Sequence, residues 1–209
     1  MPDSQSKTER RPIAARSSRW AGWMAARLAA GSVTPNQISV LSIGFAALGA
    51  GLIAVGQSWP AWIAAALCVQ LRLVCNLLDG MVAIEGGKSS PVGALYNEFP
   101  DRIADSLLLV PLGYAAGVPF LGWLAALLAA LTAYVRVFGG ALGQAQDFGG
   151  VMAKQRRMAA LTAGLVAQAV ESGFAPTRWS LLAAAVVIAA GSLATCATRT
   201  LAVARRLAA

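Results

Sequence analysis

The sequence predicts an all-α, polytopic membrane protein. Of its 209 residues, 57% are hydrophobic and only 12% are charged, and the mean hydropathy is +0.63. The apolar residues gather in six stretches, and about 20 apolar residues are enough for a helix to span a bilayer. We therefore expect an N-terminal arm over residues 1–31, ending in an interfacial amphipathic helix, and a domain of six transmembrane helices over residues 32–209.

The N-terminal arm combines basic and aromatic residues. Residues 1–31 contain six Lys or Arg, and Trp20, Trp23 and Arg27 recur at helical spacing. This pattern predicts an interfacial helix over about residues 13–30, with cations toward anionic headgroups and rings toward acyl chains. The first long apolar run begins only at Ile38, which disfavours a cleaved signal peptide.

The transmembrane helices are expected where apolar runs are bounded by helix signals. Thr34 and Pro35 mark the start of the first span, because such a pair favours a helix N-terminus. A polar, glycine-containing connector over residues 139–157 separates the fourth span from the fifth. The predicted spans cover residues 38–56, 60–84, 91–117, 119–138, 158–172 and 179–198, and Arg199 is expected to end the last of them.

Charge placement predicts the orientation. Six spans put both termini on one side, where the basic residues also gather, whereas the opposite loops contain only Arg178. The positive-inside rule then predicts cytoplasmic termini. The net charge of +8 is accounted for by orientation and headgroup attraction, and no motif indicates nucleic-acid binding. The Ala- and Arg-rich composition favours a bacterial inner membrane, and the absence of His excludes His-based catalysis and His-ligated zinc.

Polar residues interrupt the second and third spans. A charged side chain at mid-bilayer costs about 2.5–3.5 kcal/mol, so Asp79, Asp101 and Asp105 indicate a functional site. In the second span, four residues share one helical face at positions i, i+3, i+4 and i+7: Asn76, Asp79, Gly80 and Ala83. In the third, four residues recur every fourth position: Gly93, Asn97, Asp101 and Asp105. A short connecting loop makes the two helices antiparallel, so these faces can converge.

Convergent oxygen donors without soft ligands suit a hard divalent cation, Mg²⁺ or Mn²⁺. We expect these donors to be Asn76, Asp79, Asn97 and Asp101. Such cations commonly serve phosphate chemistry. The small residues Gly80, Ala83 and Gly93 would let a nucleotide or diphosphate approach the backbone closely.

This stretch resembles the signature of the CDP-alcohol phosphatidyltransferase family, D-x-x-D-G-x-x-A-R, then eight residues, then G-x-x-x-D-x-x-x-D. The chain matches every spacing, from Asn76-x-x-Asp79-Gly80-x-x-Ala83-Ile84 through eight residues to Gly93-x-x-x-Asn97-x-x-x-Asp101. It departs from the signature at three positions: Asn76, Ile84 and Asn97. The six-span plan and the basic N-terminal arm also resemble the family.

The resemblance implies transfer of a phosphatidyl group from a CDP-linked lipid, such as CDP-diacylglycerol, to an acceptor hydroxyl, with release of CMP, in phospholipid biosynthesis. It implies two divalent metal ions at the four signature Asp positions, a homodimer, and Asp101 as the base that accepts the acceptor proton. Asp79 would ligate metal near the CDP moiety, which Gly80, Ala83 and Gly93 would border. Three cations resemble family residues that bind an acceptor phosphate: Arg136, Lys154 and Arg157.

The departures leave alternatives open. Asn retains an oxygen ligand but loses the negative charge of Asp, so the site can hold one metal ion instead of two. Alternatively, Glu85, Glu98 or Asp105 can supply the missing charge. The aspartates can instead pair with Arg72 or Arg102, and the basic residues can instead bind headgroups. Two other functional classes stay open. One is a catalytically impaired family member that binds CDP-lipid in a regulatory or scaffolding role, and the other is a small transporter.

Overall fold

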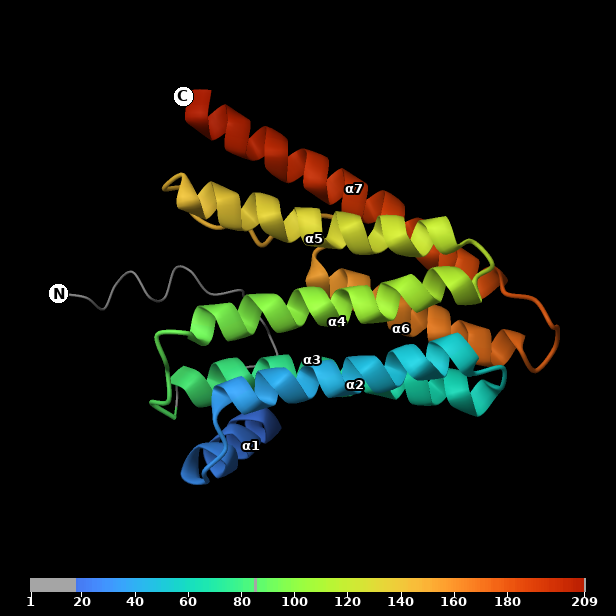
Figure 1. The fold of residues 1–209 in the computed structure, drawn as a ribbon, viewed down its shortest axis with the longest axis horizontal. Helices are drawn as coiled ribbons and strands as arrows, with labels where there is room; N and C mark the ends of the chain where they lie inside the picture. Colours follow the sequence, from blue (N-terminus) through green and yellow to red (C-terminus); the bar gives the residue numbers. More distant parts are fainter. Residues whose placement is uncertain (1–17, 85, 209) are drawn as a thin grey trace.

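The computed structural model describes residues 18–84 and 86–208, and this part of the chain is helical without strands. Figure 1 shows the long helices lying side by side, with a short helix packed across one end of the bundle. The helices are α1 (Arg19–Ala30), α2 (Pro35–Val55), α3 (Trp59–Ile84), α4 (Gly93–Ala115), α5 (Pro119–Ala141), α6 (Lys154–Glu171) and α7 (Trp179–Ala208). The predicted all-α class is confirmed. Residues 13–17 of the expected interfacial helix, and Glu85, lie outside the described residues.

Four of the described helices are long and apolar enough to cross a membrane: α2, α3, α5 and α7. Charged residues in the first half of α4 and at the start of α6 lower the hydropathy of these two helices. The chain is a multi-pass membrane protein. The sequence predicted two further spans, which correspond to α4 and α6.

Helix α2 begins with the signal expected from the sequence. Thr34 and Gln37 form a capping box: the Gln37 amide donates to Thr34 Oγ1 at 3.3 Å, and the Thr34 amide donates to Gln37 Oε1 at 2.9 Å. Pro35 occupies the first turn, where its missing N–H costs nothing. The start of α2 is therefore rigidly fixed.

Helix α4 is packed among three other helices, α2, α5 and α7. Leu108, Leu109 and Leu112 are fully buried in the core of the bundle. Near the end of α4, a Cβ on Gly113 would lie 2.4 Å from the backbone nitrogen of Gly122 in α5, so only glycine permits this helix contact. This packing holds the polar half of α4 in a defined position.

Two predicted boundaries are wrong. Helix α6 begins at Lys154 rather than at residue 158, so Lys154 and Arg157 belong to the helix and not to the connector. Helix α7 continues to Ala208 rather than ending at residue 198. Arg199, expected to terminate the last span, is 7% exposed and donates to the carbonyls of Gly149 and Thr132 at 2.7 Å. These two carbonyl oxygens give the buried guanidinium hydrogen-bond partners, so α7 can continue past Arg199.

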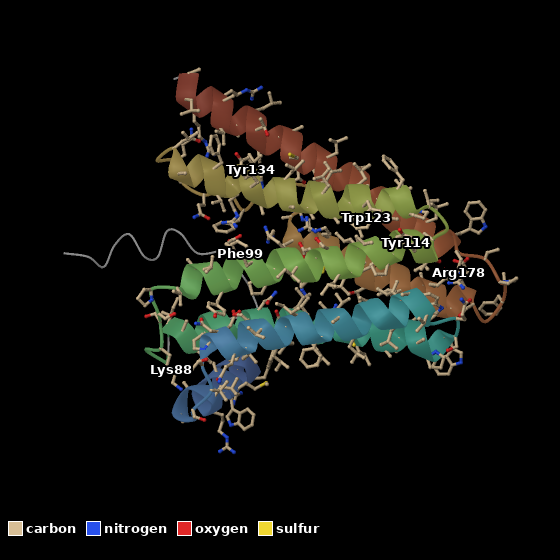
Figure 2. All side chains as sticks on the ribbon, viewed as in Figure 1. Lys88, Phe99, Tyr114, Trp123, Tyr134 and Arg178 are labelled. Carbon is tan, nitrogen blue, oxygen red and sulfur yellow. The ribbon has the colours of Figure 1, made fainter. Side chains whose placement is uncertain are left out.

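Two loop cations lie at opposite ends of the bundle. Figure 2 shows Lys88 at the end of the bundle that holds the α3–α4 connection, and Arg178 at the opposite end. Lys88 Nζ donates to the carbonyls of Gly31 and Val33 at 2.5 and 3.2 Å, which ties this connection to the end of α1. Within α1, Ala21 and Ala25 are buried, whereas Trp23 is exposed, as expected of an amphipathic helix.

Candidate functional site

A cavity of about 710 Å³ is lined by residues of α1, α3, α4, α5, α6 and the connecting segment 142–153. All four expected oxygen donors line this cavity: Asn76 and Asp79 from α3, and Asn97 and Asp101 from α4. Helix α3 packs closely against α1, α2 and α6 rather than against α4, but side chains of α3 and α4 meet across this cavity, where Asn76 contacts Asp101, 25 positions later in the sequence. We call this the donor cavity.

Asp79 is held by a residue of α2 that does not line the donor cavity. Its carboxylate is 4% exposed, and its Oδ2 accepts a hydrogen bond from Ser39 Oγ of α2 at 2.7 Å. Asn76, one turn earlier on α3, crosses to α4, where its Nδ2 donates to Asp101 Oδ1 at 3.0 Å. The two aspartates therefore lie on facing helices, each with a fixed hydrogen-bond partner.

Asp101 is surrounded by cations. Lys154 Nζ contacts Asp101 Oδ1 directly. Arg72 Nη2 lies 3.6 Å from the same oxygen, and Arg102 Nη2 lies 3.6 Å from Oδ2. The sequence left ion pairs with Arg72 and Arg102 as an alternative role for this aspartate, and both pairs occur. Asp101 nevertheless also lines the donor cavity.

Asp105, one turn beyond Asp101, belongs to a buried charge network. Arg72 Nη2 and Arg157 Nη2 each donate to this carboxylate at 2.6 Å, one to each oxygen. The exposed fractions are 0% for Arg72, 1% for Asp105 and 2% for Arg157. This network joins α3, α4 and α6. Arg157, predicted to contact the acceptor, instead pairs with Asp105 and lines neither this cavity nor the one described next.

A second cavity, of about 890 Å³, is strongly basic, and we call it the basic cavity. Its lining includes five cations and one carboxylate, namely Arg102, Arg136, Lys154, Arg156, Arg199 and Asp147. Four residues line both cavities: Arg136, Phe148, Lys154 and Gln155. The two cavities are therefore neighbours, separated by a short layer of side chains.

Arg136 of α5 is the centre of that layer. Its guanidinium donates to Glu98 Oε1 of α4 at 2.5 Å and to Gln146 Oε1, and it lies 5.0 Å from the ring centroid of Phe148. Arg136 is 5% exposed and faces the protein interior, not the headgroups. It thereby fixes segment 142–153 against α4.

Three small residues were expected to border the nucleotide, and only one of them lines the donor cavity. Gly80 lines the donor cavity, whereas Ala83 and Gly93 do not. A Cβ added at Gly93 would lie 3.6 Å from Ser90 Oγ, an ordinary contact, so no close approach requires glycine there. Ile84, which replaces the signature Arg, lines the donor cavity as an apolar residue.

The structure adds Arg199 and Ser39, which the sequence did not single out. Arg199 was interpreted as the basic end of a span, although the apolar residues after it were a sign that the helix continues. Ser39 gave no signal, because a serine within an apolar helix usually bonds to its own backbone.

The donor chemistry fits a hard divalent cation. Within the described residues, no three Asp, Glu or Cys side chains come together as metal ligands. A cation in the donor cavity would therefore use the carboxylates of Asp79 and Asp101 together with the amide oxygens of Asn76 and Asn97.

No family model matches the chain. An archaetidylinositol phosphate synthase of Aeropyrum pernix is 33% identical over 155 residues, covering 68% of this chain and 79% of that protein. A bifunctional IPC transferase and DIPP synthase of Rubrobacter xylanophilus is 41% identical over 85 residues. That match covers 41% of this chain but only 19% of the bifunctional protein, so most of the latter has no counterpart here.

Solved structures share the fold. Phosphatidylinositol phosphate synthase of Mycobacterium tuberculosis with CDP-DAG bound has a TM-score of 0.76 at 23% identity, covering 89% of this chain and 94% of that one. The same enzyme in complex with manganese and citrate has a TM-score of 0.73 at 23% identity, covering 88% of each chain.

The bundle and its two polar cavities define an all-α, membrane-embedded transferase of phospholipid biosynthesis. The match to the Aeropyrum synthase also identifies the family of this transferase. The chain belongs to the CDP-alcohol phosphatidyltransferase family.

Proposed function

We propose that the protein transfers a phosphatidyl group from a CDP-linked lipid to the hydroxyl of a phosphorylated alcohol, with release of CMP. The observation that carries this proposal is the placement of Asn76, Asp79, Asn97 and Asp101 around one cavity that adjoins a basic one. The donor diphosphate would occupy the first cavity and the acceptor phosphate the second. The donor cavity also has apolar lining, including Trp20 and Leu77, which suits a lipid substrate.

In the proposed reaction, the acceptor oxygen attacks the lipid-side phosphorus of the diphosphate. The bond from that phosphorus to the oxygen of CMP breaks, and CMP leaves with the bond electrons. Asp101 accepts the hydroxyl proton, a role that fits its place beside Lys154 between the cavities. Lys154 then holds the anionic phosphates as they react.

A Mg²⁺ or Mn²⁺ ion, when bound, would neutralise diphosphate charge and stabilise CMP as the leaving group. Asp79 would hold it with Asp101, Asn76 and Asn97, and Gly80 would leave room for the nucleotide. Ala83 and Gly93, which do not line this cavity, have no part in the proposed site.

The acceptor is assigned to phosphorylated alcohols because the basic cavity is built for an anion. Arg136, Lys154 and Arg156 line it, and Arg199 adds a buried cation. A cavity lined mainly by cations attracts an anionic acceptor more strongly than a neutral alcohol. The names of two relatives, archaetidylinositol phosphate synthase and phosphatidylinositol phosphate synthase, support a phosphorylated polyol such as inositol phosphate as the acceptor.

We further propose that α2 to α7 all span the bilayer, with α4 and α6 shielded by the more apolar helices. The single cation of the far-end loops, Arg178, supports cytoplasmic termini in a bacterial inner membrane. The homodimer implied by the family resemblance is part of this proposal.

The test is CMP release by the purified protein in lipid micelles with CDP-diacylglycerol and Mn²⁺. Inositol phosphate and glycerol phosphate are compared with inositol, glycerol and serine at equal concentrations. We expect release only with a phosphorylated acceptor. Release with a neutral acceptor alone would overturn the acceptor assignment, and lipid-independent uptake of a solute would favour a transporter instead.

A further inference from the structure

We propose that Ser39 is a positioning residue that orients Asp79 for cation binding, an inference that rests on the proposed function. Ser39 lies on α2, outside the signature on α3 and α4, and does not line the donor cavity. Its hydroxyl reaches Asp79 from behind, across a sequence separation of 40 residues.

The geometry favours the carboxylate over the usual partner of a helical serine. Ser39 Oγ lies 2.7 Å from Asp79 Oδ2 and 3.2 Å from the carbonyl of Pro35, one turn earlier on α2. A hydroxyl has one proton to donate, and a bond to a carboxylate is shorter and stronger than one to a neutral carbonyl. The proton of Ser39 therefore goes to Asp79.

This bond fixes the orientation of the carboxylate. Oδ2 accepts from Ser39, which restricts the rotation of the group that Asp79 offers in the cavity it lines. Ser39 is 3% exposed and Asp79 is 4% exposed, so water has little access to replace the hydroxyl. Carboxylates that bind metal are commonly fixed in this way, and loss of such a partner typically weakens metal affinity about 10- to 100-fold.

The backbone that carries Ser39 is itself fixed. Ser39 lies in the second turn of α2, directly after the capping box of Thr34 and Gln37 and the ring of Pro35. The hydroxyl thus projects from a helix end with little freedom, which is what a positioning residue needs.

Ser42 provides a matched control on the same helix. It is 0% exposed, and its hydroxyl donates only to the carbonyl of Ser39, at 2.6 Å. Removing either hydroxyl deletes one buried oxygen from the same region of α2. Only removal of the Ser39 hydroxyl changes the surroundings of Asp79.

The experiment measures Mn²⁺ binding to the full-length protein by the loss of the free-ion electron paramagnetic resonance signal. Variants are Ser39→Ala, Ser39→Thr and Ser42→Ala, each with thermal unfolding measured in the same detergent. We expect Ser39→Ala to raise the Kd for Mn²⁺ about tenfold or more, Ser39→Thr to stay within about threefold of wild type, and Ser42→Ala within about twofold.

Wild-type affinity in Ser39→Ala would overturn the inference while leaving the proposed function intact. Equal weakening in Ser39→Ala and Ser42→Ala would also overturn it, because the effect would then be one of packing. No Mn²⁺ binding by folded wild-type protein would overturn both the inference and the cation that the proposed function includes. If Ser39→Ala does not fold, Ser39→Thr decides, since a tenfold loss with the hydroxyl retained contradicts the inference.

Discussion

Lys154 of α6 and Asp101 of α4 form an ion pair at the point where the donor and basic cavities adjoin. Lys154 lines both cavities, whereas Asp101 lines only the donor cavity. The amine can therefore contact an acceptor phosphate on one side while the carboxylate faces the donor on the other. This relationship explains why the proposed base is found beside a cation.

Asp101→Asn should lower the rate of CMP release by about 100-fold or more, because the amide cannot accept the acceptor proton. The measurement is kcat with saturating CDP-diacylglycerol and phosphorylated acceptor. Because Asn leaves Lys154 without its carboxylate, thermal unfolding of the variant is measured alongside kcat to confirm that it is folded. Activity within twofold of wild type would remove the base assignment.

Arg156→Gln should raise KM for the phosphorylated acceptor about fivefold, equivalent to about 1 kcal/mol of an exposed cation–phosphate interaction. Arg156 is exposed and lines the basic cavity, so its loss should cost little stability. KM for CDP-diacylglycerol should hardly change.

Arg178→Gln is the matched control for this effect, since it removes the same charge at the opposite end of the bundle (Figure 2). We expect wild-type KM values from this variant. Equal effects from the two substitutions would mean that net charge, and not the basic cavity, controls acceptor binding.

Asn76→Asp should make the protein more dependent on a divalent cation. Asn76 Nδ2 donates to Asp101 Oδ1, so an aspartate there places two carboxylates side by side. Their repulsion should lower the Tm in EDTA, and Mn²⁺ should restore it and bind more tightly than to wild type. Unchanged Mn²⁺ affinity and an unchanged Tm in EDTA would show that residue 76 does not face the cation.

Asp105→Asn should destabilise the protein by about 3–5 kcal/mol, because it leaves two buried guanidinium groups without their carboxylate. Reversible unfolding in a denaturing detergent provides the measurement. Replacing the whole network, with Asp105→Leu, Arg72→Met and Arg157→Met, should recover much of that loss. A triple variant less stable than Asp105→Asn alone would show that the network itself stabilises the bundle.

The sequence predicted the parts of the site that depend on local spacing. Asn76 and Asp79 share a face of α3, Asn97 and Asp101 share a face of α4, and the short loop between the helices makes the faces meet. Helical periodicity is enough for this inference. The same reasoning identified Thr34 and Pro35 as the start of a helix.

Partners distant in the sequence could not be predicted. Arg157 was predicted to bind the acceptor and Arg199 to end a span, but each has a partner about 50 positions away: Arg157 pairs with Asp105, and Arg199 donates to the Gly149 carbonyl. Ser39 reaches Asp79 from a separate helix. Periodicity within one helix carries no information about which residues a neighbouring helix presents.

The layer of Arg136, Phe148, Lys154 and Gln155 between the two cavities has a kinetic consequence. In the proposed reaction, the CDP-linked lipid and the phosphorylated alcohol each have a cavity of their own, so both can be bound at once. We therefore expect group transfer by single displacement through a ternary complex. Double-reciprocal rate plots should intersect rather than run parallel, and no phosphatidylated enzyme should accumulate when the polyol is withheld.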